Sequence, residues 1–191
     1  LLLLNNDIEA IKPGWLEAMV EQSVRPAVGC VGAVLLYPDH TIQHGGVVIG
    51  MHDAADHAYR RLNLKHGVHY GRSRLLTGWG AVTGACLMLR RELLIRCGGF
   101  DEGLPVEFND IDLCLQLGSL GYRHVIPPDA CLVHHESQSR DASGSRTSTP
   151  ALSRMRCRWG QRLLSSQPWW PTQSHPHRDD GSPEGLPEFL V

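Results

Sequence analysis

The chain has 191 residues, of which 42% are hydrophobic and 20% are charged, and its formal net charge is -2. These values are typical of a soluble globular domain, and they exclude a disordered chain, a collagen-like chain and a strongly basic nucleic-acid-binding protein. No apolar run approaches the roughly 20 residues that a membrane-spanning helix needs. We therefore expect one folded domain with a single sizeable core.

Strands are predicted wherever a short apolar run is bounded by Gly, Pro or polar residues. These runs cover residues 1–4, 28–37, 41–49, 81–89, 122–126 and 130–133. Helices are predicted where apolar residues recur along one helical face. These segments lie between Pro13 and Pro26 and over residues 90–97, 108–121 and 151–166. Residues 50–76 are polar and rich in His, Arg and Gly, without periodicity, which predicts a long loop.

The alternation of strands and helices predicts an α/β domain with a mainly parallel sheet. We assign residues 1–140 to this domain and the Ser-, Thr- and Gly-rich residues 141–150 to a linker. Residues 151–166 are predicted to form a terminal helix, and the Pro-rich residues 167–191 a poorly ordered tail.

The six cysteines are spread along the chain, and none lies in a Cys-x-x-Cys pair. This spacing argues against a zinc cluster and against a dense disulfide framework. Most of the cysteines sit inside apolar runs, so buried free thiols are expected. The six are Cys30, Cys86, Cys97, Cys114, Cys131 and Cys157.

Oxygen ligands follow the first predicted strand. Asn5, Asn6 and Asp7 come directly after the apolar residues 1–4. Ligands of α/β sheets bind at the carboxyl ends of strands, and a carboxylate beside an amide oxygen can hold Mg²⁺ or Mn²⁺. The same three residues also suit an ordinary turn with an Asx cap, and the sequence leaves both interpretations open.

Three carboxylates lie within six residues at the start of the helix predicted over 108–121, namely Glu107, Asp110 and Asp112. One interpretation is helix capping, with Asn109 or Asp110 as the N-cap. The other makes one carboxylate a general base that accepts a proton from a substrate hydroxyl. Asp110 and Asp112 are two positions apart and point to different sides of a helix, so one can face a pocket while the other caps or braces the helix.

A polar cluster closes the strand predicted over 130–133. It contains His134, His135, Glu136 and Arg140, a combination that suits contact with a metal or a phosphate. Successive residues of a strand point to opposite faces, so only one of the two histidines is expected to be a ligand.

The segment of residues 81–86 is small and apolar, which allows close backbone approach but also fits plain strand packing. No glycine-rich phosphate loop of the GxGxxG or GxxxxGK[ST] type occurs. No GxSxG motif occurs either, which argues against an esterase-like hydrolase.

Taken together and in this order, these segments resemble family 2 glycosyltransferases of the nucleotide-sugar-dependent GT-A type. The similarity is strongest to bacterial enzymes that build surface polysaccharides such as rhamnose-containing O-antigens, and it extends over residues 1–172. The matching segments are LLLLNNDIEAIKPGWLEAM, VGAVLLYPDHTIQHGGVVIG, AVTGACLMLRRELLIRCGGFDE, FNDIDLCLQLGSLGYR, HHESQSR, RWGQRL and QPWW.

The resemblance implies a role for each matching residue. Asp7 falls in the DxD metal motif, with Asn5 in place of the first Asp, and would bind Mg²⁺ or Mn²⁺ on the donor diphosphate. His134 or His135 matches a histidine that helps to hold the metal or the diphosphate. Asp110 falls at the catalytic base. The substrate-binding candidates are Thr83, Gly84, Ala85, Asn109, Asp112 and Arg140.

The implied reaction is inverting transfer of a sugar from a nucleotide-diphosphate donor to a hydroxyl of a glycan or a lipid-linked glycan. The implied location is cytoplasmic, either free or peripheral to the membrane at the inner face of the plasma membrane, with no nucleic acid as partner. The family domain begins with a βαβ region that binds the nucleotide, and nothing here corresponds to it, so a domain truncated at its amino terminus is expected.

Two alternatives stay open beside this interpretation. One is an inactive, truncated module that binds glycan and lacks the nucleotide-binding half. The other is a metal-dependent phosphoesterase that uses Asp7, Asp110 and His134, although such sites usually hold two metals and more ligands than the sequence offers.

Overall fold

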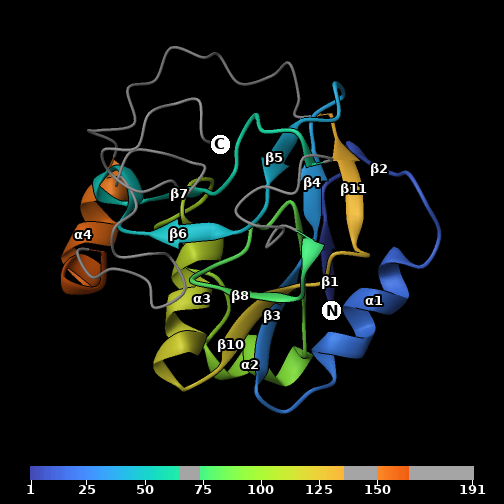
Figure 1. Ribbon diagram of the computed structural model, residues 1–191. Helices are drawn as coiled ribbons and strands as arrows, with labels where there is room; N and C mark the ends of the chain where they lie inside the picture. Colours follow the sequence, from blue (N-terminus) through green and yellow to red (C-terminus); the bar gives the residue numbers. More distant parts are fainter. Residues whose placement is uncertain (65–73, 136–149, 164–191) are drawn as a thin grey trace.

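The computed structural model describes residues 1–64, 74–135 and 150–163, which form a mixed α/β domain (Figure 1). The strands are β1 (Leu2–Leu4), β2 (Ile8–Ala10), β3 (Val28–Gly32), β4 (Val34–Leu36), β5 (Ile42–His44), β6 (Val47–Ile49), β7 (Ala55–His57), β8 (Thr77–Trp79), β9 (Cys86–Leu89), β10 (Arg123–Ile126) and β11 (Cys131–His134). The helices are α1 (Trp15–Ser23), α2 (Arg91–Arg96), α3 (Asn109–Ser119), α4 (Pro150–Leu163) and the single turn η1 (Met51–Asp53). The predicted tail, and the predicted linker apart from Pro150, lie outside the described residues.

The strands form a five-stranded sheet in the order β1-β9-β3-β10-β8, a four-stranded sheet in the order β2-β11-β4-β5, and the pair β6-β7. The α/β class is confirmed, but the expectation of a mainly parallel sheet is wrong. Only β3 with β10 and β4 with β11 pair in parallel, and the other six strand pairs are antiparallel. The described chain between β3 and β9 consists of strands and one helical turn. β9 runs antiparallel to both of its neighbours, and the described residues of this connection contain no crossover helix that would return it in the direction of β3.

The single strand predicted over residues 28–37 is two strands that belong to different sheets. β3 pairs in the five-stranded sheet and β4 in the four-stranded sheet, with Ala33 between them. Every residue from Val28 to Leu36 is buried. A continuous apolar run gives no signal of the point where the chain changes sheets.

The predicted loop over residues 50–76 contains regular structure. η1 leads into β7, which pairs antiparallel with β6, and β8 begins at Thr77. Only β5, the first part of the predicted strand over 41–49, pairs with β4 as a hairpin partner. Short strands of three residues are too brief for a clear alternating pattern, which is why the sequence predicted a loop here.

Two helices cover opposite faces of the five-stranded sheet, with α1 and α3 on either side of β3 in Figure 1. On the α1 side, Met19 packs with Val31 in one apolar cluster. On the α3 side, Cys30 packs with Leu113 in another. Because alternate residues of β3 point to opposite faces, this one strand contributes to both clusters.

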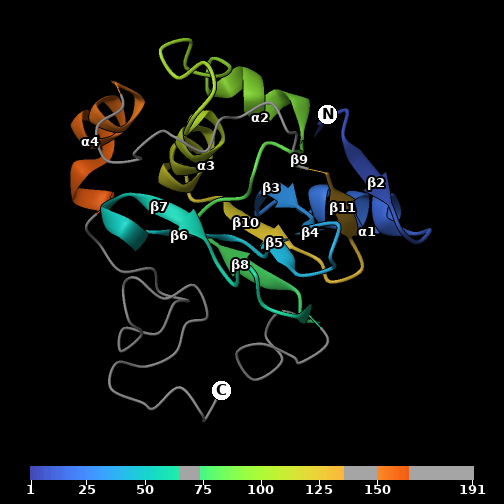
Figure 2. The same ribbon diagram turned by 90° about the horizontal axis from the view of Figure 1, so that it is seen from above.

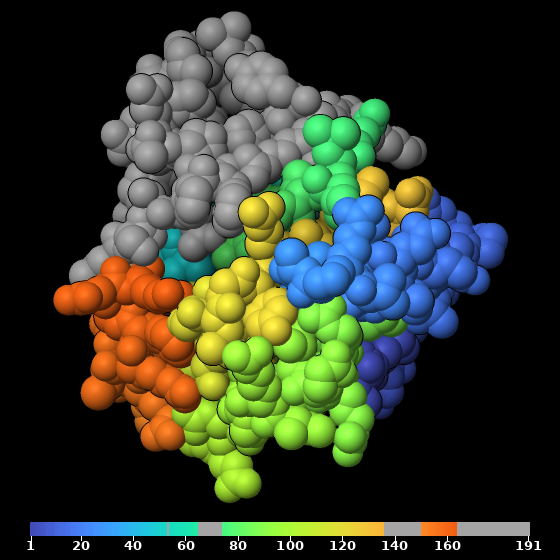
Figure 3. Space-filling model, turned by 90° about the horizontal axis from the view of Figure 1, so that it is seen from below, coloured from blue at the N-terminus to red at the C-terminus, as the bar shows by residue number. Residues whose placement is uncertain are grey.

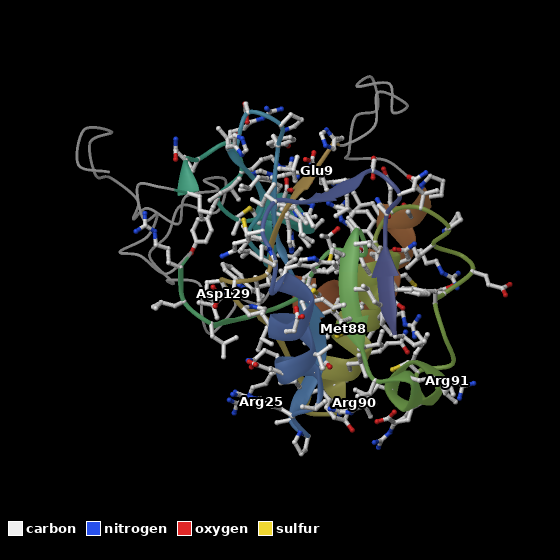
Figure 4. All side chains as sticks on the ribbon, turned by 90° about the vertical axis from the view of Figure 1, so that its right-hand side faces the viewer. Glu9, Arg25, Met88, Arg90, Arg91 and Asp129 are labelled. Carbon is white, nitrogen blue, oxygen red and sulfur yellow. The ribbon has the colours of Figure 1, made fainter. Side chains whose placement is uncertain are left out.

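An arginine joins the end of α1 to the start of α2. The guanidinium of Arg90 donates hydrogen bonds to the backbone carbonyls of Ser23 at 3.0 Å, Arg25 at 2.7 Å and Pro26 at 3.2 Å. Figure 4 shows Arg90 beside Arg25 at the end of α1. The last turn of α1 contains no basic residue, so Arg90 supplies the positive charge that a helix C-terminus favours.

The terminal helix α4 packs against α3, and Figure 3 shows it (orange) along one flank of the molecule beside the segment that carries α2 and α3. The indole N–H of Trp159 donates to Oδ1 of Asp112 at 2.7 Å, and the guanidinium of Arg158 lies 3.2 Å from the same oxygen. Arg154 donates two hydrogen bonds to Asp101, at 2.8 and 2.9 Å. None of the helices in the described segments is both long and apolar enough to cross a membrane.

We predict that Trp159→Phe destabilises the fold by about 1.5–3 kcal/mol, because it removes a hydrogen bond to the carboxylate of Asp112, which is 1% exposed. Urea unfolding measures this change. Gln161→Ala, at an exposed position of the same helix, is the control and should leave the midpoint nearly unchanged. Equal midpoints for Trp159→Phe and the unsubstituted chain would contradict the bracing role of Trp159.

Candidate functional site

A cavity of about 680 Å³ gathers residues from segments that are far apart in the sequence. The regions that meet there include the turn after β1, the segment from β5 to β7, the segment before β9, the start of α3, the end of β11 and the first turn of α4. The predicted site residues that line it are Asn5, Asp7, Thr83, Gly84, Ala85, Asn109, Asp110 and His134. The structure therefore brings most of the candidate residues together at one place.

Strand register brings Asp7 and His134 together. β11 pairs antiparallel with β2, and His134 lies opposite Ile8, the residue after Asp7. Nε2 of His134 lies 3.1 Å from Oδ1 of Asp7 and 3.4 Å from Nδ2 of Asn5. The end of one strand and the turn before another thus place a carboxylate, an amide and an imidazole in contact.

The neighbouring histidine points elsewhere, as strand alternation predicts. His135 lies 2.8 Å from Glu9 in an exposed pair and does not line the cavity. Figure 4 shows Glu9 on β2, at the end of the molecule opposite Arg25. Of the two adjacent histidines, only His134 can act together with Asp7.

Asp110 lies in the first turn of α3 with both carboxylate oxygens fixed by backbone N–H groups. Gly84 donates to Oδ2 at 2.7 Å and Ile111 donates to Oδ1 at 2.8 Å. Burial is the largest influence on this carboxyl and raises its pKa above the ordinary value of 3.8, despite the opposing effect of the N–H donors. The side chain is thus a fixed carboxylate with a raised affinity for protons.

The expected N-cap at Asn109 or Asp110 is wrong. The N-cap is Phe108, whose φ of 63° is in the left-handed region, and no side chain caps the helix. Each of the next two side chains instead accepts a hydrogen bond from the N–H that follows it: Asn109 from Asp110 at 2.7 Å, and Asp110 from Ile111. The side chains of Asn109 and Asp110 thus satisfy two N–H groups at the helix start, and Asp110 also lines the cavity.

Two other predicted substrate-binding residues are not placed in the cavity. Asp112 is buried on the α4 side of α3, where it binds Trp159 and Arg158. Asp110 and Asp112 therefore take the two different roles that their spacing allows, one facing the pocket and one bracing. Arg140 lies outside the described residues.

Sequence reasoning missed a histidine pair from β5 and β7. His44 accepts a hydrogen bond at Nε2 from the N–H of Thr83 at 3.4 Å, and its Nδ1 lies 2.7 Å from Nδ1 of His57. His44 is fully buried, and burial lowers its pKa well below 6.5, with His57 and Arg60 adding to the effect. His44 is therefore neutral, and it donates its Nδ1–H to His57. The available signal was the repeated histidine across the strand predicted over 41–49 and the loop predicted over 50–76.

A cationic side chain completes this wall of the cavity. Arg60 donates to Oδ1 of the buried Asp56 at 2.9 Å, and His52 lies 3.1 Å from the other oxygen. His57, Arg60 and Asp56 all line the cavity. The cavity thus presents N–H donors as well as the carboxylates of Asp7 and Asp110, which suits a ligand that carries both anionic groups and hydroxyls.

A second cluster of possible metal ligands lies in the core, away from this cavity. Nitrogen or sulfur atoms of Cys30, Cys114 and His124 approach within 4.8 Å of one another. Both ring nitrogens of His124 are already bound to backbone, one to the N–H of Cys30 at 3.2 Å and one to the carbonyl of Cys114 at 2.8 Å. The buried cysteines of this cluster thus act as core residues, as their apolar surroundings predict.

No protein-family model matches the chain. The chain is 48% identical over 139 residues to the uncharacterized protein y4gI of Sinorhizobium fredii, and 45% identical over 143 residues to the O-antigen biosynthesis protein RfbC of Myxococcus xanthus. It is 29% identical over 143 residues to the N-acetylglucosaminyl-diphospho-decaprenol L-rhamnosyltransferase of Mycobacterium tuberculosis. This chain is related to family 2 glycosyltransferases.

These relatives are longer proteins. Their matches cover 72%, 74% and 66% of this chain, but the chain spans only 15%, 11% and 44% of y4gI, RfbC and the rhamnosyltransferase. A solved structure, the mannosyltransferase PcManGT of Pyrobaculum calidifontis with GDP-mannose and Mn²⁺, is 19% identical over 72% of this chain and 32% of that chain, with a TM-score of 0.46. A likeness this weak transfers neither ligand to this chain.

We predict that His44 makes the stability of the fold depend on pH below 6.5, its ordinary pKa. In that range the unfolded chain binds a proton at His44 and the folded chain does not, so stability falls as the pH falls, by about 1.4 kcal/mol per pH unit for one proton. Urea unfolding at about pH 5 and about pH 7.5 should show a shallower slope for His44→Gln. His40→Gln, at an exposed turn, is the control and should keep the original slope. The same slope in both variants would contradict a neutral, buried His44.

Proposed function

We propose that this chain carries a catalytic centre for glycosyl transfer, which moves a sugar from a nucleotide-diphosphate donor to a hydroxyl of a glycan or lipid-linked glycan during surface polysaccharide synthesis. The observation that carries the proposal is that Asp110, Asp7 and His134 open onto one cavity. The names of the relatives supply the reaction class, and one of them specifies a lipid-linked substrate.

Asp110 is the proposed catalytic base. Its oxygens accept backbone N–H bonds from Gly84 and Ile111, which fixes the carboxylate while leaving further lone pairs for a substrate hydroxyl. Its raised pKa makes it a stronger proton acceptor than an ordinary aspartate. Asp110 takes the proton as the hydroxyl oxygen attacks the anomeric carbon on the side opposite the leaving diphosphate, which inverts the configuration at that carbon. General-base help of this kind contributes about 10²–10⁴-fold to a rate.

Asp7, Asn5 and His134 are the proposed holders of a divalent cation. Oδ1 of Asp7 is buried and accepts no hydrogen bond from any described residue, so a carboxylate oxygen is left for a ligand. Carboxylate, amide and imidazole donors fit Mg²⁺ or Mn²⁺. When bound, such a cation neutralises the charge that develops on the departing diphosphate.

The remaining lining residues bind and orient substrate in this proposal. The backbone of Thr83, Gly84 and Ala85 and the side chain of Asn109 lie beside the base. His57 and Arg60, which also line the cavity, offer N–H groups for sugar hydroxyls or phosphate oxygens. With a lipid-linked acceptor, we place the reaction at the cytoplasmic face of the plasma membrane.

We predict that Asp110→Asn lowers kcat for transfer by about 10²–10⁴-fold, because asparagine cannot accept the hydroxyl proton. A nucleotide-release assay on the native gene product with Mn²⁺ and acceptor measures the rate, and donor titration should show that binding survives. Asp129→Asn, an exposed aspartate paired with Lys12, is the matched control and should keep full activity. Equal rates for Asp110→Asn and the unsubstituted protein would remove Asp110 from the base role, and donor cleavage independent of acceptor would favour a phosphoesterase.

We predict that kcat/KM falls on the acid side with a midpoint above 3.8, the ordinary value for aspartate, because burial raises the pKa of Asp110. The base works only when ionised, so activity is present above this pKa and is lost as the pH drops through it. A pH–rate profile at saturating metal tests this expectation. An acid midpoint at or below 3.8 would contradict it.

A further inference from the structure

Gln43 is a buried polar residue of β5 that lines the cavity beside the proposed cation-binding residues. Its side chain is 6% exposed, and its Oε1 lies 2.6 Å from Nδ1 of His134, which is 8% exposed. A contact this short between buried groups fixes the orientation of the imidazole ring.

The two polar neighbours of His134 agree on where its proton lies. Oε1 of Gln43 is an acceptor, so Nδ1 carries the hydrogen and donates it. Nδ2 of Asn5 is a donor at 3.4 Å from Nε2, so Nε2 presents a lone pair. These two contacts correspond to the Nδ1–H tautomer of His134, whose Nε2 lies beside Oδ1 of Asp7.

This tautomer explains the unsatisfied oxygen of Asp7. Oδ1 of Asp7 lies 3.1 Å from Nε2 of His134, and no N–H of a described residue donates to it. Two acceptor atoms this close repel each other when nothing lies between them. A divalent cation bound by both atoms turns that repulsion into attraction.

The fold explains why a glutamine can reach His134. β5 and β11 lie on either side of β4 in the four-stranded sheet, and the register of β4 with β5 shifts next to Gln43. Gln43 therefore contacts a residue two strands away, a distance that suits a long side chain.

We propose that Gln43 is a positioning residue that holds His134 in the Nδ1–H tautomer, so that Nε2 of His134 and Oδ1 of Asp7 together form a binding site for a divalent cation. The inference rests on the cation site of the proposed function and assigns its geometry to a residue outside the metal motif. Residues that hydrogen-bond to a metal-binding side chain typically change metal affinity about 10–100-fold.

The tautomer is tested first, on the unsubstituted 191-residue chain without metal. Long-range ¹H–¹⁵N correlation spectra of ¹⁵N-histidine-labelled protein at neutral pH distinguish Nδ1–H, Nε2–H and doubly protonated rings, and His134→Asn assigns the His134 signals. We expect the Nδ1–H form. An Nε2–H ring, with the Gln43 amide turned to donate, or a doubly protonated ring would overturn the proposal.

Metal affinity is tested next, by titration with Mn²⁺ followed by electron paramagnetic resonance. We expect Gln43→Leu to weaken Mn²⁺ binding about 10–100-fold and Gln43→Glu, which keeps an acceptor for Nδ1–H, to restore it. Gln22→Leu removes another buried glutamine, on α1, and serves as the matched control with unchanged binding. Asp7→Asn locates the signal by abolishing it.

The outcomes separate this inference from the proposed function. Mn²⁺ binding that is absent in the unsubstituted chain, or equal in Gln43→Leu and Gln22→Leu, overturns the role of Gln43. A positioning effect of Gln43 on Mn²⁺ binding without any sugar transfer supports the inference and rejects only the transferase. The tautomer measurement needs no substitution of Gln43, so the proposal stays testable if Gln43→Leu does not fold.

Discussion

The candidate site depends on the strand register that places His134 opposite Ile8. A slip of one residue would turn every side chain of β11 to the other face of the sheet. The exposed His135 would then take the inner position, and Asp7 would lose its imidazole neighbour. β11 is held against such a slip on both sides, since it pairs antiparallel with β2 and parallel with β4, and three of its residues are hydrophobic and buried. The packing of the apolar strand β11 thus determines which of the two histidines lies beside Asp7.

Asp110, the proposed base, is positioned by the start of α3 and not by strand pairing. α3 begins at a left-handed Phe108, and Asp110 in its first turn accepts one hydrogen bond from Gly84, before β9, and one from Ile111 of the helix itself. Asp112, two residues on, is buried by α4 and has the indole of Trp159 as a partner. Two identical side chains on one helical turn therefore differ in role because one faces a cavity and the other faces a packed helix.

The sequence predicts the motifs of this site better than their supporting residues. Asp7, Asp110 and His134 each have an ordinary explanation as turn, helix-start or strand-end residues, but together and in this order they resemble the motifs of one enzyme family, and the structure brings all three to one cavity. Gln43 gave no such signal, because a glutamine after a turn is ordinary until its contact with a distant strand is known. The strand directions could not be predicted either. An apolar run that is buried on both faces, as in β3 and β4, does not indicate which strand pairs with it or in which direction.

The packing of α4 determines where a shortened version of this protein can end. Leu152 lines the cavity, and Met155 and Leu163 are buried in the main core, so this helix is an integral wall of the domain. An expression boundary placed ahead of Pro150 would expose apolar surface on α3 and leave the carboxylate of Asp112 facing solvent. Soluble production for crystallography or screening therefore calls for a carboxyl end no earlier than Leu163.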